Sequence, residues 1–360
     1  MKETKKPKVK KEDLQAAKGM RDIIGDQFHL YQGFFEKASE IALYYGFKPI
    51  ETPILEKEEL FTRGVGGDTD IVSKEMFTLK TKGGDHLTMR PEYTASVMRA
   101  YLEHGMQSLP QPVMIYYYGP CFRHENPQKG RYRQFWQFGM EILGTKKSIA
   151  DATIIRIIVT ILEECGLKNF TLKLNSIGDA ECRGAYRREL INYYKKHIRS
   201  ICPDCRERMK TNPLRLLDCK NPGCQEIKKE APESIGALCA DCKAHFKEVL
   251  EYLDAMGIAY EMDSTLVRGL DYYSRTVFEF FVNEESEDGE GTKSLAIGGG
   301  GRYDYLPKEL GVRKDVPAVG VSFGVDRIIE LSSYAKLMPR IVKKPKVFFI
   351  QLSFEAKLRS

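Results

Sequence analysis

The chain has 360 residues, 42% of them apolar and 29% charged, which is enough to bury a sizeable core in two or three domains. The charged content argues against membrane and low-complexity classes, and no apolar run approaches the ~18 residues that span a bilayer. The formal net charge is +6, but residues 1–11 alone carry six lysines and one glutamate. We therefore expect a basic disordered tail at 1–12, with weak attraction to nucleic acid as the alternative, and a nearly neutral body.

The first half of the chain contains both helical and extended patterns. Apolar residues recur at helical spacing from about Gln27 to Tyr45, and Gly46 is placed to end that helix. The segment 47–55 contains two prolines, which suits an extended strand at a sheet edge or an interface. Further elements are expected as strands at 76–80 and 86–90, a helix opened by Pro91 and Glu92, a strand–turn–strand unit within 119–144, a helix at 149–164 and a strand at 170–174.

The amino-acid composition and periodicity of the sequence change at about residue 181. From there to about 257 it is rich in Cys, Lys and Glu without strand periodicity, which predicts a mostly helical inserted domain. Strand patterns resume at 276–282 and 294–301, and a last helix is expected at 323–331. Antiparallel strands flanked by helices, without regular βαβ alternation, predict an α+β fold. The expected domains are a main one formed by 13–180 and 258–334, the insertion 181–257, and at 340–360 the start of a truncated α/β domain.

The strand–turn–strand unit, GPCFRHENPQKGRYRQFWQFGMEILG, concentrates the candidate functional side chains. With a strand period of two, the alternate apolar residues of FWQFGMEIL face a core, while Gln137, Gly139 and Glu141 face the other way. Antiparallel pairing across the turn would bring Arg123 near Gln137 and Glu141, and Gly139 would leave room for a small ligand. The alternative is a plain ion pair between Arg123 and Glu141.

Basic residues crowd the turn between these two strands. Lys129, Arg131 and Arg133 have too few acidic neighbours in the sequence to be explained by ion pairing. An arginine fork matches phosphate oxygens in a bidentate manner. A charged loop over a polar sheet face therefore favours a polyphosphate that lies on that sheet.

The strand–turn–strand unit resembles motif 2 of the class II aminoacyl-tRNA synthetases, in the form found in histidyl-tRNA synthetases. The resemblance covers nearly the whole chain. GFKPIETPIL resembles motif 1, whose interface proline would be Pro53, and AVGVSFGVDRIIEL resembles motif 3. MRPEYTASVMRA resembles a further family segment, and AIGGGGRYD and LVRGLDYYSRTVFEF resemble the two histidine-specific signatures, of which the latter is highly specific. The resemblance implies the antiparallel class II sheet flanked by helices, and a homodimer joined through motif 1.

The resemblance also implies a site that activates L-histidine with ATP and Mg²⁺ and then charges tRNA(His). The implied catalytic arginines are Arg123 on the α-phosphate, Arg327 at the γ-phosphate and Arg268 between the α-phosphate and the substrate carboxylate, with Arg131 as a further ATP contact. The implied histidine contacts are Glu92, Thr94, Gln137 and Arg268 around the ammonium and carboxylate groups, Glu141, Tyr272 and Tyr273 around the imidazole, and Tyr93 in the pocket wall. Tyr93 stands where the family usually has glycine, which would narrow the pocket. Acceptor-stem contacts would come from the loop 126–131.

Three of these features have an alternative structural interpretation. Arg268 could be held by Asp271. Tyr272 and Tyr273, if they lie in a strand, would point to opposite faces, so that at least one of them would serve packing. The run GGGG at 298–301 could be a flexible turn, although we interpret it as strand backbone that a ligand can approach.

Six of the nine cysteines fall within residues 202–242. Two Cys-x-x-Cys pairs could supply one tetrahedral Zn²⁺ site, with Cys202, Cys205, Cys239 and Cys242 as ligands. The alternative is a set of reduced, buried thiols that pack small helices, and the family resemblance does not favour a metal. An odd cysteine count without an export signal indicates a cytoplasmic protein.

Three functions therefore compete. The first is a ligase that joins histidine to tRNA(His), which the retained Arg123, Arg268 and Arg327 and the cysteine-rich insertion favour. The second is the histidine-binding regulatory subunit of ATP phosphoribosyltransferase, which resembles the catalytic domain, charges no tRNA and would suit the early C-terminus. The third is a zinc-stabilised nucleic-acid-binding protein, which leaves the polar sheet face unexplained.

Overall fold

The structure is a computed structural model, and it describes residues 14–67, 69–127, 130–285, 292–331, 337–340 and 355. The predicted tail at 1–12, Lys129 and nearly all of the predicted domain at 340–360 lie outside the described residues. Across the described ranges, no helix combines the length and the apolar character that a membrane crossing requires.

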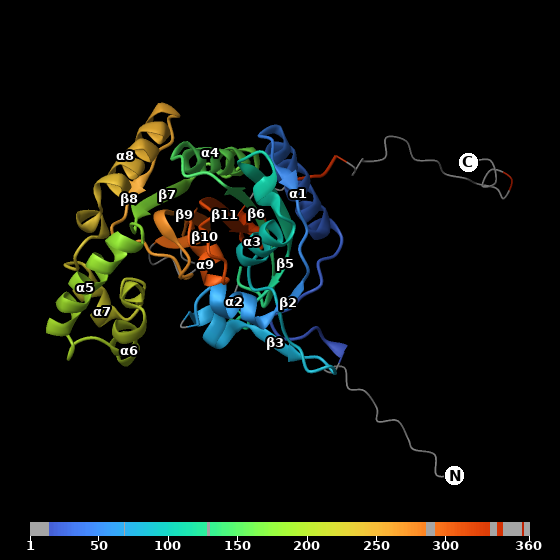
Figure 1. Cartoon of the computed structure of the whole chain (residues 1–360). Coiled ribbons are helices and arrows are strands. Elements are labelled where there is room, and N and C mark those ends of the chain that lie inside the picture. Colours follow the sequence, from blue (N-terminus) through green and yellow to red (C-terminus); the bar gives the residue numbers. More distant parts are fainter. Residues whose placement is uncertain are drawn as a thin grey trace, which may run out of the picture.

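An eight-stranded sheet forms the centre of the molecule (Figure 1). Its strands follow the order β1, β5, β6, β11, β10, β9, β7, β8. The central strands pair antiparallel, whereas the short edge strands β1 and β8 pair parallel with β5 and β7. The strand bounds are Lys48–Pro49 for β1, Val113–Phe122 for β5, Gln134–Leu143 for β6, Phe170–Ser176 for β7, Glu261–Met262 for β8, Ser274–Glu285 for β9, Thr292–Arg302 for β10 and Ala318–Gly324 for β11. The predicted α+β fold is confirmed.

Helices cover both faces of this sheet. One face packs against α1 (Asp26–Tyr44), α4 (Ile149–Glu164), α8 (Ala240–Ala255) and α10 (Val325–Leu331). The other face packs against α2 (Glu58–Gly64), α3 (Thr94–Glu103) and α9 (Leu306–Glu309). A smaller sheet of β2 (Leu55–Lys57), β4 (His86–Met89) and β3 (Phe77–Lys80) lies beside α2, and short helical turns form at Ile71–Glu75 (η2) and Met106–Ser108 (η3).

The alternation along β6 gives the sheet two chemically different faces. Phe138, Met140 and Ile142 are buried in the core on the side of α1 and α4, as the period of two predicted. Gln137 and Glu141 are buried on the opposite side, where the amide and the carboxyl group need polar partners. The polar face of β6 is therefore the floor on which a site can be built.

The segment between β7 and β8 is helical and lies to one side of the main sheet (Figure 1). It contains α5 (Ala180–Lys196), η4 (Pro213–Leu216), η5 (Ser234–Ala237), α6 (Pro203–Thr211), α7 (Pro222–Lys228) and α8. Tyr186, Leu190, Tyr194 and Leu216 form a small core of its own. Its last helix, α8, returns to pack on α4, so the segment is anchored at the sheet as well as through the chain.

Three predicted boundaries are wrong for local reasons. The segment 47–55 is not one strand, because its prolines lack the N–H that a continuous ladder requires, and β1 and β2 form at its two ends. The helix expected at Pro91 begins at Thr94, since the carboxylate of Glu92 accepts the N–H groups of Thr94 at 2.6 Å and Ala95 at 2.9 Å. Phe323 belongs to β11, so the last helix begins at Val325.

A fully buried ion pair joins the sheet to α4. The guanidinium of Arg302 lies 2.7 Å from the carboxylate of Asp151, and both side chains are inaccessible to solvent. Arg302 also donates to the carbonyl groups of Thr145 and Lys147, and His245 of α8 lies 3.4 Å from Asp151. The pair therefore connects β10, α4 and the helical segment at one point.

Replacing Asp151 with Asn should lower the free energy of unfolding by about 3–5 kcal/mol, because the buried Arg302 charge would lose the nearer of its two carboxylate partners and keep Asp304 at 3.4 Å. Urea unfolding at pH 7 measures this change. Lys229→Ala, which breaks an exposed ion pair with Glu226, is the control and should cost less than about 1 kcal/mol. A cost of similar size in the two variants would contradict the prediction.

Candidate active site

A polar cavity of about 390 Å³ opens on the face of the sheet to which Gln137 points. Its lining includes Arg123, Arg268 and Arg327, which are far apart in the sequence. Residues of β6, β9, β10 and β11 and the loop before β9 form its floor and one wall. Three guanidinium groups thus line one cavity, as contact with a single ATP molecule would require.

Arg123 directly follows β5 and reaches the cavity at its rim. Its Nε donates to the carbonyl of Pro91 at 2.9 Å, and its guanidinium lies 5.3 Å from the centre of the Phe135 ring. The strand register places Gly119 opposite Gln137 and Ile115 opposite Glu141. Arg123 therefore shares the cavity with Gln137. The predicted closeness of Arg123 to Glu141 is wrong, because Glu141 lies four residues farther along β6 on the same face.

The alternative of an Arg123–Glu141 ion pair is also wrong. Glu141 is held by hydroxyl groups, and the carboxylate that approaches Arg123 is that of Glu125, at 3.9 Å. Glu125 also lies 3.5 Å from Arg131, so the expectation that Arg131 has no acidic partner nearby is wrong. Arg133 turns away from the cavity and donates to the backbone of Glu125 and Lys18, which makes it a loop-fixing residue.

Arg327 enters the cavity from α10 on the opposite rim. Its Nε donates to the carbonyl of Gly130 at 3.0 Å, and a second nitrogen donates to the carbonyl of Ala296. Burial, followed by the charges of nearby cations including Arg131 and Arg123, lowers the pKa of the Arg327 guanidinium below its ordinary value. The cavity thus holds positive charges close together, an arrangement that a bound polyanion would relieve.

Arg268 lines the same cavity and lies over the floor of the sheet at Gly299 of β10. Its guanidinium pairs with Glu279 of β9 at 2.6 Å, whereas the carboxylate of Asp271 accepts from Asn212 at 2.6 Å. The GGGG run is strand backbone within β10, as interpreted from the sequence. A side chain at Gly299 would meet the Arg268 guanidinium at 2.6 Å, so this bare backbone makes room for Arg268 itself.

Two predicted histidine contacts from the loop before β9 line the same cavity. Tyr272 and Tyr273 precede the strand, so the expectation that they point to opposite faces is wrong; their ring centres are 4.7 Å apart and both rings are buried. The Tyr272 hydroxyl lies 3.4 Å from the carboxylate of Glu92, which also lines the cavity. Burial raises the pKa of Glu92 above its ordinary value, although the N–H groups of Ala95 and Thr94 oppose this shift.

Glu141 lies fully buried beneath the sheet's polar face, surrounded by hydroxyl groups. Thr94 donates to it at 2.9 Å, Tyr117 at 3.0 Å and Tyr303 at 2.5 Å. Burial raises the pKa of Glu141 from 4.5 to about 8, against the lowering effect of the three donors. A β-carbon at Gly320 would lie 1.5 Å from a Glu141 oxygen. Position 320 of the neighbouring strand β11 must therefore have no side chain.

Two predictions about space in the pocket are wrong. Tyr93 does not form the cavity wall, because it is fully buried, stacked on Tyr117 at 4.2 Å and lies under the Arg90 guanidinium at 3.9 Å. Gly139 leaves no room for a ligand, since the Tyr117 hydroxyl lies 2.3 Å from the position of a β-carbon there. Both residues instead shape the packing that supports the Glu141 hydroxyl cluster.

Sequence reasoning missed Tyr117 and Tyr303, which hold Glu141. Strand periodicity gave one signal, because Tyr117 shares a strand face with Gly119 and Cys121. It also missed the network in which Asp326 accepts from Arg21 at 3.0 Å, Tyr31 at 2.6 Å and the N–H of Trp136 at 2.7 Å. No local pattern predicts that network, because its members come from distant parts of the chain.

The cysteines do not form the predicted four-residue site. Cys202 and Cys205 begin α6, whereas Cys239 and Cys242 begin α8, and each pair is grouped with other residues. The prediction joined two motifs of equal spacing that the fold separates. All nine cysteines lie in the described ranges and are free thiols.

A family model described as histidyl-tRNA synthetase matches residues 19–328. The chain belongs to the histidyl-tRNA synthetase family. The histidine–tRNA ligase of Desulforamulus reducens is 43% identical over 331 residues, which are 92% of this chain and 77% of that protein. The histidine–tRNA ligase of Halothermothrix orenii is 45% identical over 317 residues, 88% of this chain and 74% of that protein.

Solved structures agree with this assignment of the synthetase fold. The apo histidyl-tRNA synthetase of S. aureus superposes with a TM-score of 0.71 at 33% identity, over 88% of this chain and 73% of that one. A Bacillus halodurans protein described as an ATP phosphoribosyltransferase regulatory subunit/histidyl-tRNA synthetase has a TM-score of 0.66 at 23% identity, over 91% of this chain and 84% of that one. At that identity the second likeness shows the shared fold alone.

The raised pKa of Glu141 makes the stability of this synthetase depend on pH. Between 4.5 and about 8 the folded protein holds a proton on Glu141 that the unfolded chain has released, so stability falls as pH rises through this window. In the wild type, the free energy of unfolding should fall by an amount on the order of a few kcal/mol across this window. The Glu141→Gln variant should not show this fall. Urea unfolding of the ligand-free protein at pH 5, 7 and 9 measures it.

The exposed Glu251→Gln variant is the matched control for this comparison and should keep the wild-type pH dependence. If wild type and Glu141→Gln lose stability in parallel between pH 5 and pH 9, Glu141 does not carry a raised pKa.

Proposed function

We propose that the chain joins L-histidine to tRNA(His), with ATP as co-substrate and a histidyl-adenylate as intermediate. The observation that carries this proposal is the convergence of Arg123, Arg268 and Arg327 on one cavity. Three cations around one hollow suit the triphosphate of ATP, whose charge is spread over many oxygens. The ligase names of relatives at 43% and 45% identity support the same reaction.

In the first step, a carboxylate oxygen of histidine would attack the α-phosphorus of ATP, and pyrophosphate would leave. Arg123 and Arg268 would hold the α-phosphate, where negative charge builds up, and Arg327 with Arg131 would hold the far end of the triphosphate. In the second step, a hydroxyl of the terminal tRNA ribose would attack the acyl carbon, and AMP would leave. The loop 126–131, part of which lies outside the described residues, is the proposed contact with the acceptor stem.

Mg²⁺ would accompany ATP and neutralise its phosphates. The carboxylates of Glu75, Glu125 and Glu279 line the same cavity, and carboxylate oxygens are ligands that Mg²⁺ accepts. The donor set therefore fits a divalent cation beside the three arginines.

Recognition of histidine would use the acids and phenols next to the arginines. Glu92 and Gln137, both of which line the cavity, and Thr94 are proposed to receive the ammonium group. Tyr272, Tyr273 and the hydroxyl cluster around Glu141 are proposed to face the imidazole side. A buried polar wall of this kind rejects an apolar analogue, because the wall would keep unpaired polar groups.

Histidine-dependent exchange between ATP and pyrophosphate tests the proposal. The wild-type chain should exchange, and Arg268→His should reduce kcat/KM by about 10²–10³-fold, since one fixed cation near the α-phosphate is lost. Arg199→His, on the exposed end of the helical segment, is the control and should exchange normally. Histidine binding without any exchange in the wild type would indicate the regulatory-subunit alternative.

We further propose that two chains associate through the motif 1 region and that the protein works in the cytoplasm. A hollow of about 1040 Å³ opens beside Ile50, Pro53 and Leu60, and the nearby Ile54 and Leu55 are 41% and 43% exposed. Exposed apolar side chains next to a large hollow suit a second copy of the chain. The nine free thiols suit a reducing compartment.

Analytical ultracentrifugation should therefore give twice the 41.2 kDa chain mass. Ile54→Asp should shift the equilibrium to single chains by at least tenfold, because a buried unpaired carboxylate is costly. Leu14→Asp, at an exposed position that does not line this hollow, should stay dimeric. A monomeric wild type would refute the assembly.

A further inference from the structure

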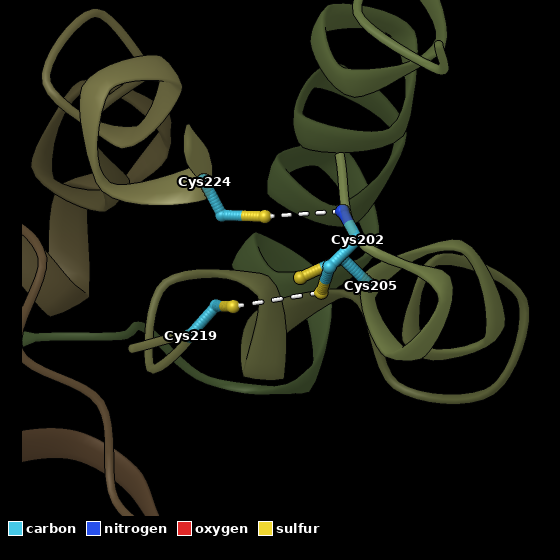
Figure 2. A group of neighbouring side chains, drawn as sticks. All are labelled: Cys202, Cys205, Cys219 and Cys224. Atoms are coloured by element: carbon cyan, nitrogen blue, oxygen red, sulfur yellow. Dashed lines mark hydrogen bonds between the residues drawn. The ribbon is translucent and has the colours of Figure 1, made fainter. Parts of the chain in front are cut away.

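The helical segment between β7 and β8 contains a convergent group of four cysteines. Cys202 and Cys205 stand at the start of α6, Cys219 follows the η4 turn, and Cys224 lies in α7. Figure 2 shows the four side chains pointing toward one another from these separate elements. Their sulfur atoms all lie within 4.8 Å of one another.

The spacing of these sulfurs matches a single tetrahedral ion. With Zn–S bonds of about 2.3 Å, neighbouring thiolates of a tetrahedral site are about 3.8 Å apart. The sulfurs of Cys202 and Cys219 are 3.8 Å apart. In an iron–sulfur cluster the four thiolates are divided over two or more irons, so some of them would stand farther apart than they do around one ion.

Backbone groups around the four cysteines favour negative charge on their sulfurs. The N–H of Cys202 donates to the sulfur of Cys224 at 3.2 Å, which stabilises charge on that sulfur (Figure 2). The Cys-x-x-Cys pair spans the first turn of α6, where the helix dipole also favours negative charge. Three of the four side chains are buried and the fourth, Cys202, is half-buried, so a bound ion would be shielded from water.

The elements that carry the four cysteines are short. Helices α6 and α7 have nine and seven residues, and η4 has four. Elements of this size bury little apolar surface, and small folds of this kind commonly use a metal or disulfides instead. The sulfurs are free thiols, which leaves a metal as the cross-link.

We propose that Cys202, Cys205, Cys219 and Cys224 bind one structural Zn²⁺ as thiolates. This site would do more than stabilise the segment, because η4 connects it to the cavity. Arg215 of η4 lines the cavity and pairs with Asp70 at 2.5 Å. The metal would thus fix the position of one wall of the active site, although the metal itself would lie away from the reacting groups.

A second group stands on its own geometry at the junction of α5 and α8. Asp179, Cys182, Cys239 and Cys242 place one ligand atom each within 4.8 Å of the others. The N–H of Cys239 donates to the Cys182 sulfur at 3.0 Å. One Asp179 oxygen caps α5 through Glu181 and Cys182, and the other faces the Cys239 sulfur at 3.8 Å.

We infer a second Zn²⁺ at this Cys₃Asp group. It has the same helix-starting Cys-x-x-Cys pair, the same N–H···S contact and a carboxylate oxygen that Zn²⁺ accepts. Arg275, 3.8 Å from Asp179, would remain a neighbour of that carboxylate. The two ions would fix both ends of the helical segment, one next to the cavity and one next to the sheet.

Metal analysis of the full chain, purified without chelators from zinc-supplemented cells, tests both sites. The wild type should carry two Zn²⁺ per chain. X-ray absorption should show sulfur neighbours with Zn–S distances near 2.3 Å and, as the other kind of neighbour, carboxylate oxygen. Cys205→Ser and Cys242→Ser should each lower the content to one. Cys165→Ser, which removes a buried thiol outside both groups, should keep two.

Each result decides one site. A wild type that carries no metal, or carries iron, overturns both, and this holds even if a variant fails to fold. Unchanged zinc in Cys205→Ser overturns the four-cysteine site, and unchanged zinc in Cys242→Ser overturns the Cys₃Asp site. Zinc content is measured without substrate, so it does not depend on the proposed ligase reaction.

Discussion

The site depends on how buried polar and charged groups are satisfied on one face of the sheet. A charge taken out of water is costly unless a partner or hydrogen bonds stabilise it. Glu141 has three hydroxyl donors, Glu92 has the first N–H groups of α3, and Arg268 has Glu279. At the rim, Arg123, Arg131 and Arg327 lie close together, and burial followed by the charges of the other two arginines lowers the pKa of the Arg327 guanidinium. A bound triphosphate would therefore neutralise the positive charge of these arginines.

Glycines make this arrangement possible inside a continuous sheet. Antiparallel strands place side chains a few ångströms apart on each face, which would leave no volume for a guanidinium or a carboxyl group lying flat on the sheet. Gly299 gives that volume to Arg268, and Gly320 gives it to Glu141. The strands remain hydrogen-bonded through these positions, so the floor is both open and rigid.

The helical segment contributes to the site although it lies to one side of the sheet. Arg215 reaches Asp70, and Asn212 reaches Asp271 next to the two tyrosines of the cavity. These contacts tie a cysteine-rich unit with a small core of its own to the substrate pocket. Cross-links within that unit would consequently affect how firmly one cavity wall is held.

The sequence by itself determined the α+β class, the helical segment, the polar face of β6 and the arginines that meet in the cavity. Each of these follows from a local period or from a motif that retains its residues. Only the tertiary structure decided which neighbours those residues meet. Arg268 pairs with Glu279, Asp271 accepts from Asn212, and the two Cys-x-x-Cys pairs belong to separate groups. The reason is physical: a local pattern fixes which way a side chain points, whereas its partner depends on the register and packing of strands and helices distant in sequence.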